Sequence, residues 1–359
     1  KSLLDIEADY RMATVYLPEI KIPMLPCELS DKTASLSPGQ NRTALSLIVR
    51  INENGEILNW EIFPSVIRTQ LALSYEDADR IITDSTHPNH DMLSVLNLLA
   101  IALEKKRSQK GAINIERPEI LLTSIESDKV SMRIIENPTP SRKLIREFMI
   151  LCNHLMASFC EHQNLPAAYR SQDEFDISDI PEDPKQGPLW RHLVIRRFQP
   201  ANLGTTPSPH AGLGVTSYTQ VTSPIRRYLD LIMQRQISLL LNSNQVLYSS
   251  EEIASVAQRA DIQLRELGKL EEVRKHYWLL KYMKQNLLNK QDGHPSDIFT
   301  AIVLDNQTTR LALMELLEYP LRVKVELPPR CAPGDTVTLH LQGVDLWQRA
   351  CQFVYVSPT

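Results

Sequence analysis

Two stretches of alternating hydrophobic and polar residues lie close together near the start of the chain. The stretch TALSLIVRI covers 43–51 and EILNWEIF covers 56–63, with Asn54 and Gly55 between them. An Asn-Gly pair between two alternating runs favours a tight turn, because both residues tolerate a positive φ. We therefore predict a β-hairpin here, and a second hairpin at 119–136.

Other stretches carry hydrophobic residues at helical spacing. The pattern predicts helices at about 91–106, at 141–162 and at about 251–290. The last of these begins with a capping box, because Ser249 and Glu252 can each accept a hydrogen bond from the other's backbone N–H.

The periodicity changes from helical to alternating after residue 295. The segment QDGHP at 291–295 ends the long helix, and five short alternating runs follow it. Five short strands within about 65 residues favour a small closed barrel such as an OB-fold. We therefore predict an α+β protein, in which a mixed α/β body at 1–292 precedes a β-barrel at 296–359.

The stretch TSPIRRY at 222–228 has the features of a helix start. Thr222 or Ser223 can cap the helix, and Pro224 then stands at the first helical position, where its missing N–H does no harm. Hydrophobic residues continue at helical spacing beyond it. The helix is therefore predicted to cover about 223–242.

Two arginines occupy the first turn of this predicted helix. A helix N-terminus already carries partial positive charge, so Arg226 and Arg227 would be unfavourable there without an anion. One interpretation is an anion site, in which free N–H groups and two guanidinium groups converge on a phosphate. The other is that Arg226 pairs with Asp230 one turn later, while Arg227 lies on the solvated face.

Composition and charge limit the class of protein. The hydrophobic fraction is 43%, the charged fraction is 23%, and no hydrophobic run is long enough to cross a membrane. The net charge of −4 excludes a generally basic nucleic-acid binder, but it allows a basic channel within an acidic shell. The five cysteines show no metal-ligand spacing, which favours reduced thiols in a cytoplasmic protein. The chain opens without a Met or a secretion signal, so we expect a fragment or a processed chain.

Three longer segments carry a resemblance to a known family. They are RMATVYLPEIKIPMLPCELSDKTASLSPGQNRTALS at 11–46, SRKLIREFMILCN at 141–153 and SPHAGLGVTSYTQVTSPIRRYLDLIMQRQI at 208–237. In this order and at about this spacing they resemble the ribonuclease II/ribonuclease R (RNB) exoribonuclease family. The resemblance implies an RNB-type catalytic domain at 1–292 and an OB-type RNA-binding barrel at 296–359.

The resemblance also implies an activity. Members of this family degrade single-stranded RNA processively in the 3′→5′ direction, release nucleoside 5′-monophosphates and use a divalent metal ion held by aspartates. We therefore expect Mg²⁺-dependent hydrolysis, with single-stranded RNA as the partner, no membrane, and a monomer. The family's acidic metal-binding motif precedes the VYLP segment, so this chain is expected to begin after that motif and to contain no metal ligands.

The resemblance implies a role for each residue that matches one of the family's motifs. Arg226 matches the arginine that stabilises the scissile phosphate, and Arg227 matches a neighbouring phosphate contact. Tyr16 matches the tyrosine that packs on the 3′-terminal base, which suits recognition without sequence preference because every base has a π-face. Tyr75 matches a tyrosine near the terminal ribose. Local sequence alone would also allow either tyrosine to be a core residue.

Three further residues are candidates for RNA contact. Ser223 and His210 lie in the same block as Arg226, and His210 could either face RNA or order its loop. Glu147 is the second of two positions that hold glutamates in the family, where the first helps to recognise the ribose 2′-OH. The first position holds Arg146 here, which puts discrimination of RNA from DNA through that contact in question.

The family's second stacking aromatic residue is also missing. It should fall within GAINIERPE at 111–119, where Asn114 and Ile115 stand, so the terminal base would be clamped from one side only. These departures keep open an alternative, a catalytically silent RNA-binding module. A protein-interaction scaffold is a third alternative, which only the acidic net charge supports.

Two groups of acidic residues and histidines resemble metal-ligand spacings but are assigned to other roles. The stretch 173–185 holds three aspartates spaced three apart, yet its acidic and proline-bearing composition is typical of a solvated loop. His87 and His90 precede Asp91, a pattern that favours the capped start of a helix with surface histidines over a metal site.

Overall fold

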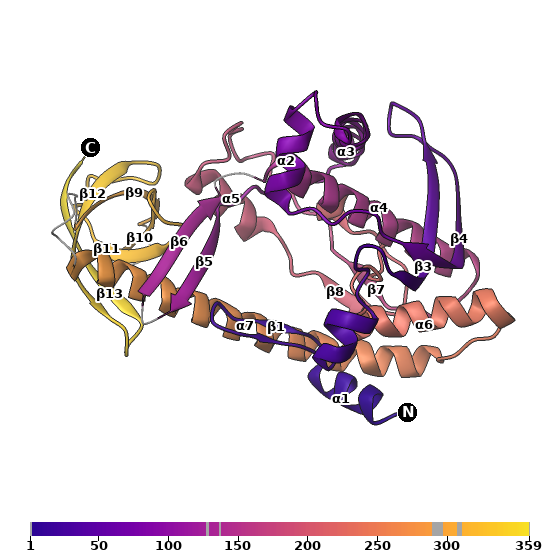
Figure 1. Cartoon of the computed structure of the whole chain (residues 1–359). Helices are drawn as coiled ribbons and strands as arrows, with labels where there is room; N and C mark the ends of the chain where they lie inside the picture. Colours follow the sequence, from indigo (N-terminus) through magenta and orange to yellow (C-terminus); the bar gives the residue numbers. More distant parts are fainter. Residues whose placement is uncertain (1, 127–128, 136–137, 289–296, 307–310, 359) are drawn as a thin grey trace.

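The computed structural model describes residues 2–126, 129–135, 138–288, 297–306 and 311–358 (Figure 1). It contains a body of helices and two-stranded antiparallel sheets, followed by a five-stranded barrel at the C-terminal end. The long helix α7 (Ser250–Leu288) extends from the body to the barrel (Figure 1). The predicted mixture of helix and sheet with a C-terminal barrel is confirmed.

Helices and short strand pairs alternate along the body. In chain order they are α1 (Leu3–Arg11), β1 (Val15–Tyr16), β2 (Lys21–Ile22), the π-helical η1 (Glu28–Thr33), β3 (Asn41–Ile51), β4 (Ile57–Arg68), α2 (Tyr75–Thr83), α3 (His90–Gln109), β5 (Glu119–Glu126), β6 (Lys129–Ile135), α4 (Pro140–His162), β7 (Tyr169–Ser171), α5 (Pro188–Arg197), β8 (Asn202–Gly204), the 3₁₀ turn η2 (Ala211–Leu213) and α6 (Tyr228–Ser243). The barrel follows α7 and consists of β9 (Ile298–Asp305), β10 (Leu311–Leu316), β11 (Arg322–Glu326), β12 (Thr336–Asp345) and β13 (Ala350–Pro358).

Both predicted hairpins form. Strands β3 and β4 pair antiparallel with one irregularity near the turn, between Arg50 and Ile51. Strands β5 and β6 also pair antiparallel, with an irregularity between Thr123 and Glu126. The first turn requires glycine for two reasons. Gly55 has a φ of +74°, and a Cβ added to it would lie 3.2 Å from the backbone carbon of Ala102 in α3. The hairpin therefore packs closely on α3 at its turn.

The core of the body lies mainly between α4, α6 and the first half of α7. Hydrophobic residues at helical spacing supply it, among them the fully or almost fully buried Met156, Ile232, Met233, Ile237 and Ile253. The predicted helix at 141–162 is confirmed as α4, and its buried face includes Leu144, Leu151 and Leu155. Burial of this face, rather than helix propensity, stabilises the element.

The five barrel strands form one antiparallel sheet in the order β11-β10-β9-β12-β13. The terminal strands β11 and β13 also contact each other, so that the sheet is nearly closed. Leu279, Leu280 and Met283 of α7 pack into the barrel core, whereas Ile253 and Ala257 of the same helix pack into the body core. One helix therefore contributes to both hydrophobic cores.

Two expectations concern the ends of this arrangement. The predicted helix break at 291–295 and the predicted boundary between body and barrel lie outside the described residues. Of the helices within the described ranges, none is both long and apolar enough to cross a membrane.

Candidate functional site

Helix α6 begins at Tyr228, so the prediction that it begins at Ser223 is wrong. Arg226 ends a turn in which its N–H donates to the carbonyl oxygen of Ser223 at 3.1 Å, and the backbone of Arg227 is extended and pairs with Ala13. Thr14 N–H donates to the carbonyl oxygen of Arg226 at 3.0 Å, and Tyr228 N–H donates to that of Met12 at 2.8 Å. This pairing with the segment after α1 holds the two arginines ahead of the helix rather than in its first turn.

Asp230 supplies the anion that the start of α6 requires. Its side chain is fully buried, and its Oδ2 accepts from the Ser223 N–H at 2.9 Å and from Arg227 Nη2 at 2.7 Å. Burial raises the pKa of Asp230, and the charge of Arg227 partly offsets this rise. The suggested pair of Arg226 with Asp230 is therefore wrong. Arg227 binds Asp230, whereas Arg226 is exposed.

A cavity of about 310 Å³ lies beside this pair. Arg170, Arg227 and Arg265 line it together with the carboxylates of Asp230 and Asp261. Arg265 pairs with Asp261 at 2.8 Å, whereas Arg170, like Arg226, forms no side-chain hydrogen bond or ion pair within the part of the chain that the structure describes. The remaining lining residues are Met12, Pro200, Ala201, Leu203, Gln220, Leu229, Ala260 and Leu264. The region therefore has a surplus of positive charge.

Two buried polar atoms at this cavity have no hydrogen-bond partner among the described residues. They are Oδ1 of Asp230 and Nε of Arg227. Most buried polar atoms in proteins are hydrogen-bonded, so each exception calls for an explanation. A water molecule or a ligand hydroxyl group would satisfy both atoms, because it can donate to Oδ1 and accept from Nε–H.

His210 stands in the loop that precedes these residues. Its N–H donates to the carbonyl oxygen of Val215 at 3.0 Å, and its ring lies edge-on to Tyr218 with 5.8 Å between ring centroids. Burial and the nearby charge of Arg170 lower the pKa of His210 to about 4, so the ring is neutral at pH 7. Of the two expected roles, these contacts support ordering of the loop, and contact with RNA stays a prediction.

The two candidate tyrosines are both exposed, so the interpretation of them as core residues is wrong. Tyr16 in β1 is 44% exposed, and its N–H donates to Glu271 Oε1 of α7 at 2.7 Å. Tyr75 at the start of α2 is 40% exposed, and the Arg142 guanidinium lies 4.4 Å from its ring centroid. Both rings keep a surface that a nucleotide could contact.

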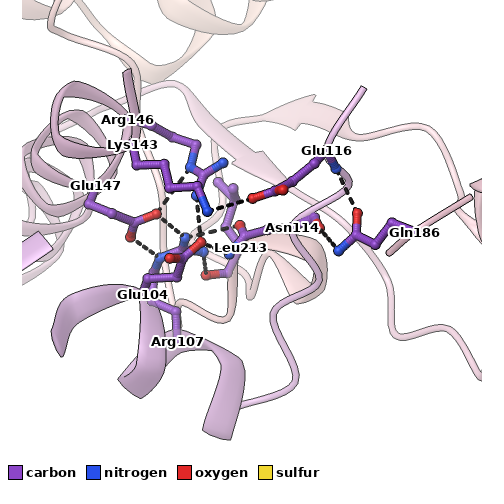
Figure 2. Close-up of polar contacts among 9 residues, drawn as sticks. All are labelled: Glu104, Arg107, Asn114, Glu116, Lys143, Arg146, Glu147, Gln186 and Leu213. Atoms are coloured by element: carbon purple, nitrogen blue, oxygen red, sulfur yellow. Dashed lines mark hydrogen bonds and ion pairs between the residues drawn. The ribbon is translucent and has the colours of Figure 1, made fainter. Parts of the chain in front are cut away.

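Glu147 lies in a closed network of charges (Figure 2). The side chain is 1% exposed. Its carboxylate accepts from Arg107 through both oxygens, at 2.8 and 2.7 Å, and from Arg146 Nε at 3.1 Å. Arg146 also donates to Glu104 at 2.6 Å, and Arg107 to the carbonyl oxygen of Leu213 at 2.9 Å. Direct contact of Glu147 with RNA would therefore require these ion pairs to open.

The same network holds the stretch between α3 and β5 (Figure 2). Asn114 donates to Glu104 at 2.7 Å, and Gln186 Nε2 donates to the carbonyl oxygen of Asn114 at 2.9 Å. The Glu116 N–H donates to Gln186 Oε1 at 2.8 Å, and the Glu116 carboxylate pairs with Lys143 at 2.7 Å. Two departures from the family pattern, Arg146 and Asn114, thus belong to one structural unit.

Sequence reasoning did not identify Glu104 and Arg107 as members of this network. They stand three residues apart in α3, a spacing typical of an exposed ion pair along a helix. Their carboxylate and guanidinium partners, Arg146 for Glu104 and Glu147 for Arg107, lie 42 and 40 residues away in the chain. An unusually buried arginine cannot be distinguished from a surface arginine by its local sequence.

The described residues do not by themselves fit a divalent-cation site. Among them, no three His, Cys, Asp or Glu side chains lie close enough to hold a metal ion. Asp176 accepts the Ser178 N–H at 2.8 Å and Asp179 pairs with Arg197, as expected of a surface loop. His87 Nδ1 accepts the Asn89 N–H at 3.1 Å just before α3. Mg²⁺ therefore remains an expectation from the resemblance.

Comparison with known proteins places this fold and these motifs in a family. The RNB domain model matches residues 1–182 and 176–243. An uncharacterized ribonuclease of Synechocystis is 30% identical over 95% of the chain and 50% of its own length. The chloroplastic/mitochondrial ribonuclease II of Arabidopsis thaliana is 28% identical, over 95% of the chain and 42% of its own length. The chain thus spans about half the length of these relatives.

Solved structures share the fold at low sequence identity. Mycoplasma genitalium RNase R in complex with ribose-methylated single-stranded RNA superposes with a TM-score of 0.79 at 19% identity, over 99% of this chain and 64% of that one. An active-site mutant of the Dss1 exoribonuclease of Candida glabrata superposes with a TM-score of 0.84 at 20% identity, over 99% of this chain and 48% of that one. Yeast Ssd1, a pseudonuclease, superposes with a TM-score of 0.72 at 17% identity, over 94% of this chain and 45% of that one. On the match of the family model to most of its length, the chain belongs to the RNB domain family.

Proposed function

We propose that the protein is a 3′→5′ exoribonuclease, which degrades single-stranded RNA processively by Mg²⁺-dependent hydrolysis to nucleoside 5′-monophosphates. Membership of the RNB family and relatives named as ribonucleases support this proposal. In it, the body is the RNB-type catalytic domain, and the barrel is an OB-type RNA-binding domain. The whole protein's activity is part of the proposal, because the chain covers only part of its relatives.

The observation that carries the proposal is the contrast between Arg226 and Arg227. Arg227 is held by the buried Asp230, whereas Arg226 is exposed, and its backbone is fixed by pairing with the Met12–Thr14 segment. A guanidinium group on a fixed backbone can stabilise negative charge on a phosphate without reorganisation. We therefore assign the scissile phosphate to Arg226 and a supporting position at the cavity to Arg227.

Three further residues are assigned contacts with the same RNA end. Tyr16 offers an exposed ring for the 3′-terminal base, and Tyr75 offers one for the terminal ribose. The backbone N–H of Ser223 is already used by Asp230, so Ser223 would act through its hydroxyl group. Stacking on a tyrosine ring and binding of phosphates are both independent of base identity, which suits degradation without sequence preference.

The second candidate function is an RNA-binding module without catalytic activity. It is favoured by the lack of a metal-ligand cluster among the described residues, and by the saturation of Glu147 with two arginines. The fold is compatible with such a role, since one structural neighbour is described as a pseudonuclease. In this case the arginines and tyrosines would bind RNA that stays intact.

One experiment separates the two candidates. The chain is incubated with 5′-labelled single-stranded RNA in Mg²⁺ and in chelator, and the products are run on native and denaturing gels. A metal-dependent ladder that ends in a short limit product supports the exoribonuclease. A gel shift with intact RNA supports the binding module and contradicts catalysis by this chain. Intact RNA without a shift contradicts both.

A further inference from the structure

A second cavity, of about 650 Å³, lies where the body meets the barrel. Its walls come from the start of β5, from α5, from the second half of α7 and from strands β10 and β11. The lining residues are Arg117, Pro118, Glu119, Ile120, Arg191, Glu272, Lys275, His276, Leu279, Glu315, Pro320, Leu321 and Arg322. Four of them are lysine or arginine, and they come from four separate segments of the chain.

One buried carboxylate forms ion pairs with two of these cations. Glu315 of β10 is largely buried, and it accepts from Arg191 Nη2 at 2.9 Å and from Arg322 Nε at 3.1 Å. Arg191 also donates to the carbonyl oxygen of Gln186 at 2.7 Å. Each guanidinium has five N–H donors, so both retain donors for a ligand while their positions are already fixed.

Arg117 adds a positive charge that is offset only in part, by the carboxylates of Glu315 and Glu272. Its side chain forms no hydrogen bond or ion pair with any of the residues that the structure describes. Partial desolvation lowers the pKa of Arg117, and so do the charges of Arg322 and Arg191. Glu119, which also lines the cavity, is paired with Arg142 at 3.0 Å. Lys275 lines it as a further cation, and Glu272 as the remaining carboxylate.

The two cavities lie along the same face of α7. Asp261, Leu264 and Arg265 line the first cavity, and Glu272, Lys275, His276 and Leu279 line the second. Residues three, four or seven apart in a helix lie on the same side of it, which places both sets on one side of α7. Arg265 and Glu272 are separated by seven residues, or about 10 Å along the helix axis. A few nucleotides of an extended strand span that distance.

Gly268 stands between the two cavities on this face. A Cβ placed on Gly268 would meet no atom within 4 Å, so the surface there is open. Glycine inside a helix costs about 1 kcal/mol relative to alanine, and no packing contact in the described structure requires it. A ligand that lies close against the helix backbone would account for this residue.

We propose that the cavity lined by Arg117, Arg191 and Arg322 binds a phosphate group, and that this group belongs to the RNA strand whose 3′ end lies at Arg226. The identity of the strand rests on the proposed function, whereas the affinity for phosphate does not. Convergent guanidinium groups bind phosphate oxygens through paired hydrogen bonds. Among the described residues that line the cavity there is no Phe, Tyr or Trp, and the ring of His276 is hydrogen-bonded to the carbonyl oxygen of Arg349 at 3.1 Å. We therefore assign the contact to the RNA backbone, without base preference.

The test measures binding in chelator, so that it does not depend on catalysis. Fluorescence anisotropy compares a short single-stranded RNA, long enough for the first cavity only, with a longer strand that reaches the second. We expect Arg117→Ala to weaken binding of the long RNA about tenfold and that of the short RNA hardly at all. The slope of log K against log salt concentration for the long RNA should fall by about 0.7, as for one lost phosphate contact. Gly268→Glu should also weaken the long RNA selectively.

Two controls match these substitutions. Arg68→Ala removes an exposed arginine at the end of β4, and Leu270→Glu adds the same charge to α7 at another, exposed position. Neither should change the binding of either RNA by more than twofold. Equal weakening of short and long RNA by Arg117→Ala, or no weakening of either, would overturn the assignment of the strand to this cavity.

Thermal unfolding with inorganic phosphate separates this proposal from the proposed function. If the wild type binds no RNA, but phosphate raises its Tm and does not raise that of Arg117→Ala, the phosphate site stands and the RNA function fails. If the wild type binds RNA, but Arg117→Ala behaves as the wild type in both assays, the RNA function stands and this site is overturned.

Discussion

Two arginine-rich regions of the body use the same side chain in opposite ways. Around Glu147, the guanidinium groups of Arg107 and Arg146 are both bound to carboxylates. Around α6, Arg227 is bound to Asp230, but Arg226 and Arg170 have no such partner among the described residues. A partnered guanidinium group contributes to the fold, whereas one without a partner is available to a ligand. The two regions can therefore be told apart by what a substitution damages.

The largest expected effect is on the stability of the Glu147 network. Glu147→Gln leaves two arginines without their shared anion, one of them almost fully buried. We expect the free energy of unfolding to fall by about 3–5 kcal/mol, measured by urea denaturation. Glu104→Gln, at a more exposed position of the same network, should cost clearly less. A loss below about 1 kcal/mol for Glu147→Gln would mean that the network is not structural.

Arg226→Ala should impair turnover of RNA and leave the stability of the fold almost unchanged. Because the side chain is exposed and unpaired among the described residues, we expect stability to stay within about 0.5 kcal/mol of the wild type. Turnover of RNA, under conditions in which the wild type is active, should fall on the order of 10²–10³-fold with much of the binding retained. Single-turnover assays measure this. Arg227→Ala is the contrast, since it leaves the buried Asp230 unpaired and should destabilise the fold. Unchanged turnover in Arg226→Ala would remove its assigned role.

The region around α6 should also respond to pH through His210. Its pKa is lowered to about 4 in the folded state and is near 6.5 in the unfolded state, so acid favours the unfolded chain. The stabilisation is fully present above about pH 6.5 and is lost as the pH falls towards 4. Between about pH 7 and pH 5, we expect the wild type to lose about 1–2 kcal/mol more than His210→Gln, measured by urea denaturation at each pH. Identical pH profiles would show that the histidine is not desolvated.

The remaining prediction concerns the exposed ring of Tyr16. Tyr16→Ala removes an exposed ring, so stability should hardly change, but RNA affinity should fall by about 1–3 kcal/mol for the lost stacking. In an active protein, the length of the limit product should change as well. Tyr16→Phe keeps the ring and should behave as the wild type. An unaltered limit product in Tyr16→Ala would count against stacking on this residue.

Much of the fold and part of the site could be predicted from local patterns. Alternation and helical spacing identified both hairpins, helix α4, the long helix α7 and the five barrel strands. The motif blocks identified the family, which the family model confirms. These features depend on residues close together in the chain, where the period of the hydrophobic residues reports which surface is buried.

Tertiary structure decided the rest. The start of α6 depends on hydrogen bonds with Met12 and Thr14, more than two hundred residues away, which local helix-capping rules do not include. The same is true of the partner of Arg227, of the burial of Arg107 against Glu147, and of the face of α7 that joins two cavities. The sequence alone indicated which residues are candidates for contact with RNA. Only the folded chain determined which of their charges remain free to do so, because a charge is neutralised by whatever lies beside it in space and not along the chain.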